Sequence, residues 1–467
     1  MLTYSFENKG KDSLYEYLYK QIKHDILSYK LSPGEKLPSK RAFAKHLNIS
    51  TITIENAYNQ LLAEGYIYSV PKSGFYVNDI SSSKPLEDNK PTRTPLNEIS
   101  HDNIFADFTS NSTISDNFPF TIWTKIMRQV MSDYEHELMV RSPYAGIYKL
   151  RLAIADYLYQ FRGMSVEPEQ IVIGAGTEYL YGMLIQLLGR DKRYAVEDPG
   201  YQKITRIYRS NQVDCCHIPM DESGVNVDAL EQSGADILHI SPSHHFPTGI
   251  ITPISRRYDL LSWAGRSKGR YIIEDDYDSE FRLVGKPIPS LQSIDMADKV
   301  IYMNTFSKSL SSTIRISYMV LPKSLVELYK DRLGFYSCTV PNFEQYTLYR
   351  FVDQGHLEKH INRMRNYYRV QRDKVLECIK SQKDFDKVEI LEENSGLHFL
   401  LKVDTELDDM KLMERAKKNG IAISCLSQYS YLPENITEHI VIINYSGIKA
   451  EAIPEAVKRL FESLWSE

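Results

Sequence analysis

Cysteine and long apolar runs are scarce in this sequence, and no spacing of His, Cys, Asp or Glu suits a metal site. The five cysteines are an odd number, two of them adjacent at Cys215 and Cys216. This is typical of free thiols in a reducing compartment. No stretch approaches the roughly 18 apolar residues of a membrane span, and the opening MLTYSFENKGKD lacks the apolar core of a secretion signal. We therefore expect a cytoplasmic protein with no membrane partner.

The charge of the chain is unevenly distributed. Of its 467 residues, 42% are apolar and 25% charged, which is typical of a globular protein, and the length favours more than one domain. The net charge is −5, but residues 1–78 hold ten Lys and Arg against seven Asp and Glu, so the remainder carries −8. A basic N-terminal end on an acidic chain favours nucleic acid as its partner.

Residues 1–78 have the pattern of three short helices and a hairpin. Apolar residues recur every four positions over residues 13–29, a second helix follows over 39–47, and a third begins at Ser50 and is stopped by Gly65. Two strands then flank a Pro-Lys-Ser-Gly turn. This order predicts a winged helix-turn-helix, an α+β DNA-binding domain whose third helix lies in the major groove.

The predicted DNA contacts come from the third helix, the second helix and the wing. They are Ser50, Thr51, Thr53 and Asn56 facing the bases, Arg41 and Lys45 reaching phosphates, and Lys72 at the wing tip. Residues 79–104 are rich in Ser, Pro, Asn and charge, and we expect a flexible linker there.

One lysine, Lys308, stands between hydroxyl side chains after an apolar strand. The strand (300–303) enters the turn Asn304–Ser307, and a second strand, predicted over 314–321, carries Arg315. The amine of Lys308 can form an imine with an aldehyde, while Thr305, Ser307 and Arg315 bind phosphate oxygens. Taken alone, this stretch fits a solvated loop lysine better than it fits an imine-forming one.

A second stretch, YIIEDDYDSEF at 271–281, favours the chemical interpretation. An apolar strand ends there in carboxylates, with Asp275 and Tyr277 among them. A carboxylate against the ring nitrogen of pyridoxal phosphate keeps that nitrogen protonated, and a phenol can hydrogen-bond the ring hydroxyl. A third stretch, a glycine-rich turn containing Gly176, Thr177 and Glu178, can bind phosphate through backbone N–H groups.

Asp275-x-Tyr277, followed by Thr305-Phe306-Ser307-Lys308 and Arg315, resembles the fold-type I aminotransferases. The N-terminal segment LPSKRAFAKHLNIS…AYNQLLAEGYI resembles the GntR signature, so the whole chain is similar to the MocR/GabR subfamily of GntR bacterial transcription regulators. The resemblance implies a multidomain protein that binds operator DNA and pyridoxal phosphate. Residues 105–467 would form an α/β aminotransferase-like domain, with a large lobe over about 105–354 and a smaller α+β lobe over about 355–467.

The resemblance also implies roles for three further residues. Tyr201 would pack on the cofactor ring, His245 would contact the ring from the family's HQxPTG turn, and Tyr144 would reach the partner subunit's phosphate group. The last role implies a homodimer. On the DNA-binding side the chain departs from the family, since Thr51, Ile52 and Asn56 stand where many members carry arginines, and fewer guanine contacts are expected.

Two functions remain open at this stage. One is a regulator whose aminotransferase-like body senses pyridoxal phosphate, or a small amine or amino acid, as in the regulators of vitamin B6 synthesis. The other is an active aminotransferase with an accessory DNA-binding domain. Amino-acid-handling relatives place an arginine where this chain has Ile442, which disfavours turnover, although Lys203 or Arg206 could compensate.

Overall fold

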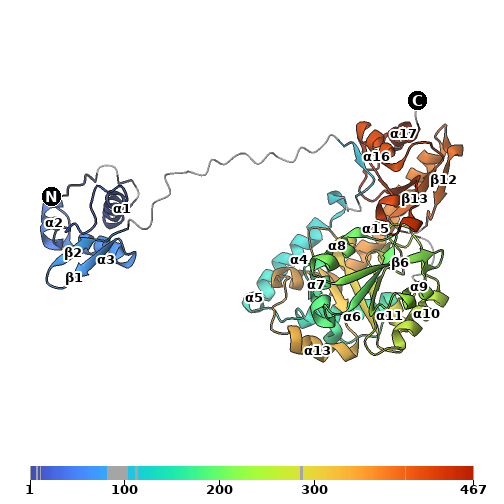
Figure 1. Cartoon of the computed structure of the whole chain (residues 1–467), viewed down its shortest axis with the longest axis horizontal. Coiled ribbons are helices and arrows are strands. Elements are labelled where there is room, and N and C mark those ends of the chain that lie inside the picture. The colour runs from blue at the N-terminus through green and yellow to red at the C-terminus, as the bar shows by residue number, and fades with distance from the viewer. Residues whose placement is uncertain are drawn as a thin grey trace. The chain divides into compact units, whose positions relative to one another are not determined.

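The structure is a computed structural model that describes residues 2–6, 9–10, 12–80, 104–110, 114–283, 288–394 and 396–465. It divides into two compact units, Met1–Ser100 and His101–Glu467 (Figure 1). Residues 81–103 of the predicted linker lie outside the described residues. Within the described ranges, every helix is too short or too polar to cross a membrane.

The N-terminal unit is the predicted winged helix-turn-helix. Its elements are α1 (Leu14–Leu27), α2 (Lys40–Leu47), α3 (Thr51–Ala63) and the antiparallel strands β1 (Ile67–Val70) and β2 (Gly74–Val77). Each helix begins at a serine, Ser13, Ser39 or Ser50, whose side chain accepts a hydrogen bond from the backbone of the first turn. One apolar cluster, with Phe43 and Tyr58 fully buried, holds the three helices together.

The C-terminal unit is built on an eight-stranded sheet in the order β4-β11-β10-β9-β8-β5-β6-β7. Its strands are β4 (Ile171–Gly174), β5 (Arg193–Asp198), β6 (Asp214–Asp221), β7 (Gly224–Val225), β8 (Ile237–Ile240), β9 (Tyr271–Asp275), β10 (Val300–Thr305) and β11 (Ser317–Val320). The pairings from β10 through β9, β8 and β5 to β6 are parallel, whereas β11 is antiparallel to both neighbours and β7 is antiparallel to β6. The carboxyl ends of the parallel strands therefore meet at one edge, where such sheets place ligands.

Helices cover both faces of this sheet. One face carries α7 (Thr177–Leu188), α8 (Gln202–Ser210) and α13 (Lys323–Leu333). The other carries α4 (Phe120–Asp133), α5 (Glu135–Met139), α6 (Tyr148–Arg162), α9 (Val227–Gln232), α10 (Ile254–Gly265), α11 (Leu291–Ile294) and α14 (Asn342–Asp353). Successive residues of β10 alternate between the faces, since Ile301 and Met303 pack towards α7 and Tyr302 towards α6. Both faces are buried, as expected for a largely parallel sheet.

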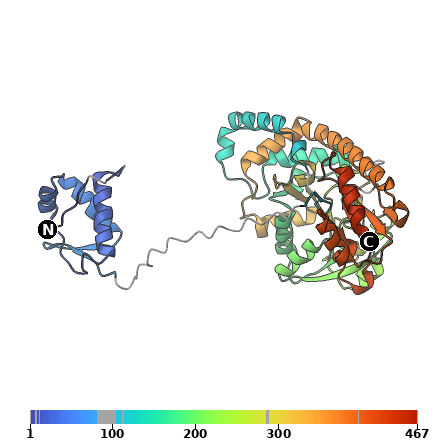
Figure 2. The same ribbon diagram turned by 90° about the horizontal axis from the view of Figure 1, so that it is seen from above.

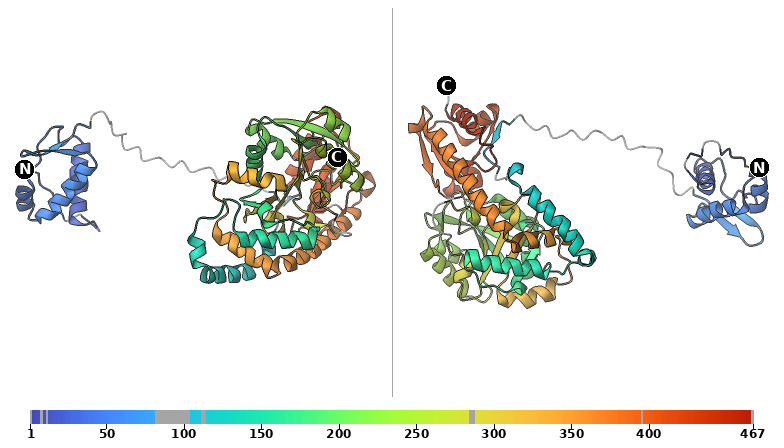
Figure 3. Two further views of the ribbon diagram at one scale, coloured as in Figure 1. Left: turned by 90° about the horizontal axis from the view of Figure 1, so that it is seen from below. Right: turned by 180° about the vertical axis from the view of Figure 1, so that it is seen from behind.

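A smaller lobe contains an antiparallel sheet in the order β12-β13-β16-β15. The strands are β12 (Val388–Leu391), β13 (His398–Val403), β15 (Ser424–Cys425) and β16 (Ile440–Asn444). The helices α15 (His356–Lys380), α16 (Asp409–Lys418) and α17 (Ile453–Leu464) pack on one face. In Figure 2 the red α17 lies beside the orange α15, and Figure 3 shows α15 running from the large lobe into the small one.

The small lobe includes residues from the start of the unit, which differs from the predicted large lobe beginning at 105. β3 (Ala106–Asp107) pairs with β14 (Ile421–Ala422), and the Phe108 N–H donates to the Ala422 carbonyl at 2.9 Å. Phe108 is fully buried in the small-lobe core. The chain therefore contributes to the small lobe before it builds the large one, and the buried Phe108 ring anchors it there.

Candidate cofactor site and DNA-binding face

Lys308 lines a cavity of about 440 Å³ at the carboxyl edge of the large sheet. Strand β10 continues to Thr305, and a short helical turn, α12 (Phe306–Ser309), follows it where a turn was expected. The Thr305 hydroxyl accepts a hydrogen bond from the Ser307 N–H at 3.1 Å and so fixes the turn. Burial lowers the pKa of the Lys308 ammonium to about 8, against the opposing charge of Asp278. The amine is thus easily made neutral, as a nucleophile requires.

Asp275, at the end of β9, faces the same cavity with one oxygen unsatisfied. Its Oδ2 accepts a hydrogen bond from the Tyr181 hydroxyl and lies 3.8 Å from His239 Nε2. Its Oδ1 is buried and has no hydrogen-bond partner among the described residues. A protonated ring nitrogen would satisfy this buried atom, so the site fits pyridoxal phosphate at its pyridine end.

The phosphate end of the cavity is formed by Arg315 and the start of α7. Arg315 precedes β11 with φ +53°, so it lies on the connection before the strand rather than on the predicted strand 314–321. Its guanidinium lies against Gly176, whose φ of +94° favours glycine, and a Cβ there would come within 2.3 Å of Nη2. Glu178 accepts hydrogen bonds from Arg315 Nη2 at 2.6 Å and from Lys203 Nζ. Arg315 and Lys203, the two cations that could bind phosphate, are therefore already paired with the Glu178 carboxylate.

One wall of the cavity is aromatic and apolar. Tyr201 meets Phe246 edge to face, with ring centroids 6.0 Å apart, and Phe246 meets Tyr429 in the same way at 5.2 Å. Behind Phe246 and Tyr429 stands a cluster that contains Ile442, which is 1% exposed. The position that holds a carboxylate-binding arginine in amino-acid-handling relatives is thus part of an apolar core.

His245 lies beneath the cavity rather than in its lining. Its Nδ1 is 2.7 Å from the Thr248 hydroxyl and its Nε2 is 3.4 Å from Glu197. Burial lowers the pKa of His245 to about 3 and raises that of Glu197 to about 8. The next residue, Phe246, lines the cavity instead. The predicted ring contact of His245 therefore corresponds to no lining position in this structure.

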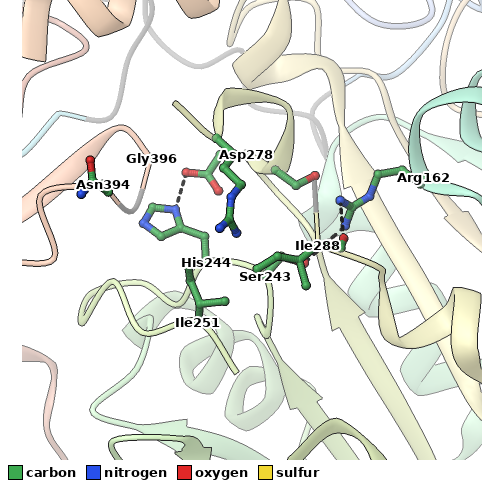
Figure 4. A pocket seen from close by; sticks show the side chains of 10 residues that line it. Arg162, Ser243, His244, Ile251, Asp278, Ile288, Asn394 and Gly396 are labelled. Carbon is green, nitrogen blue, oxygen red and sulfur yellow. Dashed lines mark hydrogen bonds and ion pairs between the residues drawn. The ribbon is translucent and has the colours of Figure 1, made fainter. Parts of the chain in front are cut away.

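Tyr277 is linked to a buried histidine and carboxylate. Its hydroxyl lies 3.3 Å from His244 Nδ1, which is 2.7 Å from Asp278 Oδ2. Figure 4 shows His244 turned towards Asp278, with Arg162 further along the same small pocket. Gly396 allows this arrangement, because a Cβ there would lie 2.7 Å from the His244 ring. The network fixes the position of the Tyr277 ring beside the cavity.

Nine of the twelve predicted cofactor residues line the cavity. They are Thr177, Glu178, Tyr201, Asp275, Tyr277, Thr305, Ser307, Lys308 and Arg315. Gly176 lies against the Arg315 guanidinium. Tyr144 does not line the cavity and packs against Tyr329, with ring centroids 6.0 Å apart. The roles assigned to them stay predictions.

The prediction missed several lining residues. They include Thr109, Ser110, Tyr181, Glu197, Phe246 and Tyr429. Tyr181 follows Thr177 by one helical turn, a spacing that could have signalled its place. Thr109, Ser110 and Tyr429 come from distant segments that only the fold brings together.

The predicted DNA contacts form an exposed face of the N-terminal unit. Thr51 and Asn56 are exposed on α3, and Arg41 and Lys45 are exposed on α2. Lys72 occupies the wing turn with φ +61°. Ser50 differs from the prediction in one respect: its hydroxyl accepts from the Thr53 N–H at 3.1 Å and lies 2.9 Å from the Thr53 hydroxyl. The Ser50 side chain thus caps the N-terminus of α3 with Thr53 as its partner, and the DNA contacts of these two residues stay predictions.

Fold and site together define a pyridoxal phosphate-binding domain of aminotransferase type, joined to a DNA-binding winged helix. Residues 107–460 match the family "Aminotransferase class I and II", and residues 14–77 match "Bacterial regulatory proteins, gntR family". The chain belongs to the MocR/GabR subfamily of GntR transcription regulators. The predicted fold class, DNA-binding regulator and cofactor are thereby confirmed.

Relatives match the chain over most of its length. An uncharacterized HTH-type transcriptional regulator of Bacillus subtilis, YdeL, is 40% identical over 97% of this chain and 98% of its own. The HTH-type pyridoxine biosynthesis transcriptional regulator PdxR of Corynebacterium glutamicum is 30% identical over 88% of each chain. Among solved structures, the Pyrococcus horikoshii kynurenine aminotransferase is 25% identical with a TM-score of 0.67, covering 78% of this chain and 91% of its own.

Proposed function

We propose that this protein is a transcription regulator that senses pyridoxal phosphate through a Schiff base at Lys308 and controls genes of vitamin B6 synthesis. The observation that carries the proposal is the apolar wall of Phe246 and Tyr429, which line the cavity and pack against the buried cluster that contains Ile442. An amino-acid substrate needs a cation there for its carboxylate. Pyridoxal phosphate by itself does not. The pyridoxine biosynthesis regulator among the relatives agrees with this choice of ligand.

The cations near the cavity do not supply a carboxylate site. Of the described residues that line it, the basic ones besides histidine are Lys203, Lys308 and Arg315. Lys308 and Arg315 are assigned to the aldehyde and the phosphate, and Lys203 is held at the phosphate end, because its partner Glu178 also binds Arg315. Arg206, the other candidate from the sequence, donates to Gln202 at 3.2 Å and does not line the cavity. Neither Lys203 nor Arg206 therefore supplies the carboxylate-binding cation that is missing at Ile442.

Spectroscopy and DNA binding test the proposal together. Protein with added pyridoxal phosphate is expected to absorb in the visible range, and borohydride should fix the label on Lys308, as peptide mass mapping would show. Titration of cofactor-free protein with the cofactor should change its affinity for its operator. A Lys308→Ala variant should bind the same DNA without responding. If the cofactor leaves operator binding unchanged while an amino acid alters it, the proposed effector is wrong.

The protein is proposed to act as a homodimer. Large apolar side chains are exposed on the body, and the most exposed among them on α4, α5, α6 and the segment after α13 are Phe120, Met139, Tyr159 and Phe335. Large apolar side chains left exposed are candidates for burial in a protein–protein contact, and we propose that these four are covered in the dimer. Sedimentation should give twice the 54.1 kDa of one chain, and Met139→Glu should shift the protein towards monomer. A wild-type monomer at micromolar concentration would contradict this.

An active aminotransferase is the second candidate function. The buried Asp275 Oδ1 and the lowered pKa of Lys308 are the features that an enzyme of this type needs. Steady turnover of an amino donor with a keto acid would support the enzyme. No turnover, or a single half-reaction, would support the regulator.

A further inference from the structure

The solvent face of α3 carries an apolar and amide stripe directly opposite the face that packs into the domain core. The buried residues are Ile54, Ala57, Tyr58 and Leu61. The stripe consists of Ile52, Asn56, Asn59 and Ala63, spaced by four, three and four residues. At about 100° per residue, these four positions fall within one narrow sector of the helix. None of them is charged.

Ile52 is the most exposed large apolar residue among those that the structure describes in the N-terminal unit, at 68%. Other large apolar side chains of the unit pack into its core or lie on the wing and at helix ends. An isoleucine on the first turn of α3 gains nothing for the isolated domain, because it is held in water. In the major groove the same side chain meets the thymine C5-methyl group, the one apolar feature that the base edges present.

The side-chain amides of Asn56 and Asn59 are available on the same stripe. Neither makes a side-chain hydrogen bond to any residue that the structure describes. The carbonyl oxygen of an asparagine amide accepts from the N6 amino group of adenine while its NH2 group donates to N7, which is the bidentate contact that identifies adenine. Asn56 follows Ile52 by one helical turn, so the two side chains would address neighbouring base pairs.

The acidic residues beside the stripe are neutralised by lysines from the other helices. Glu55 pairs with Lys40 of α2 at 2.7 Å, and Glu64 pairs with Lys23 of α1 at 2.8 Å. Without these pairs, both carboxylates would repel DNA phosphates from the helix. The ion pairs leave a face whose base-reading groups are one isoleucine and two asparagines.

We infer that α3 recognises A·T base pairs, with Ile52 contacting a thymine methyl and Asn56 binding an adjacent adenine. The partner is therefore B-form DNA whose half-site has A·T pairs, not G·C pairs, under this helix. The inference rests on the DNA binding that the proposed function requires, but it is independent of the effector. Loss of the cofactor response would overturn the proposed function and leave this inference standing.

Binding-site selection with the full-length protein, with and without pyridoxal phosphate, gives the first test. A·T pairs should be enriched at positions whose preference disappears in Ile52→Ala and Asn56→Ala. Enrichment of G·C pairs at those positions overturns the inference. So does a selection that enriches no sequence, since the stripe would then read nothing.

Base analogues give the second test and need no change to the protein. Replacing the contacted thymine by deoxyuridine removes only the methyl group and should weaken wild-type binding about fourfold. The same replacement should have no effect on Ile52→Ala. Ile254→Ala, which alters an isoleucine 50% exposed on the body, is the matched control and should respond like the wild type. An equal loss in wild type and Ile52→Ala would overturn the role of Ile52.

Discussion

The Glu178 carboxylate is paired with both cations at the phosphate end of the cavity, Lys203 and Arg315, the latter at 2.6 Å. Replacing Glu178 by an uncharged residue should therefore tighten cofactor binding. The hydrogen bond from Lys203 lowers the pKa of Glu178, with Arg315 adding to the effect, so the group is ionised at neutral pH. A phosphate that binds Arg315 has to compete with this carboxylate and also meets its charge. Glu178→Gln removes the charge and keeps the shape.

The size of the effect follows from the exposure of the three groups. All three side chains are 38 to 50% exposed, so each ion pair contributes only about 0.2–1 kcal/mol. Two like charges at close range in water repel by about 1 kcal/mol. Releasing Arg315 and removing the repulsion therefore gains about 1–2 kcal/mol, or about 5- to 30-fold in the dissociation constant. The gain should disappear as the pH falls through the lowered pKa of the wild-type carboxyl.

Titration of cofactor-free protein, followed by absorbance, measures this dissociation constant. Glu222→Gln, which alters an exposed glutamate outside the cavity, is the matched control. Pyridoxal without its phosphate is the matched ligand, and Glu178→Gln should bind it no better than the wild type does. Equal or weaker binding of pyridoxal phosphate to Glu178→Gln would refute the reasoning, because the carboxylate would then be positioning Arg315 for the phosphate.

Three further predictions concern the same cavity and its wall. Asp275→Asn should weaken cofactor binding about 10- to 100-fold, the value of a hydrogen bond to a charged group, in the same titration; Asp259→Asn on the surface should leave it unchanged. The rate of cofactor attachment, followed by stopped-flow absorbance, should rise with pH and level off above about 8, the lowered pKa of Lys308. A plateau near pH 10.5 would show an unperturbed lysine. Ile442→Ala should lower the unfolding free energy by about 2–5 kcal/mol, whereas Ile436→Ala at an exposed site should change it by less than about 0.5 kcal/mol, as thermal and denaturant melts would show.

Local sequence predicts those parts of the site in which one short segment carries the chemistry. The segment from Thr305 to Lys308 follows a strand of six buried residues, so its place at the sheet edge follows from its pattern. Asp275 follows from the same logic one strand away. The helices of the N-terminal unit were predictable because their serine caps and apolar periodicity agree with each other.

Other features depend on contacts between distant segments and carry no local signal. Tyr429 reaches the cavity from the 3₁₀ helix Leu426–Tyr429 of the small lobe, and its partner Phe246 comes from the turn after β8. His245 illustrates the opposite case: the motif places it correctly along the chain, but the side chain turns to Thr248 and away from the cavity. Sequence position alone does not determine which of two neighbouring side chains lines a cavity.

Hydrogen bonds near the wall that contains Phe246 and Tyr429 also connect the cavity with the small lobe. Asp198, fully buried at the end of β5, accepts hydrogen bonds from the Tyr431 N–H at 2.6 Å and from the Asn435 side chain at 2.8 Å. The Gly200 N–H donates to the Tyr429 carbonyl at 3.0 Å. These bonds join the carboxyl edge of the large sheet to the loop that closes the cavity. A ligand that packs against Tyr201 and Tyr429 would stabilise the arrangement in which these bonds are made, provided that it binds any other arrangement less well. We therefore propose that the apolar wall, in place of a carboxylate-binding arginine, couples the small lobe to filling of the cavity by the cofactor itself.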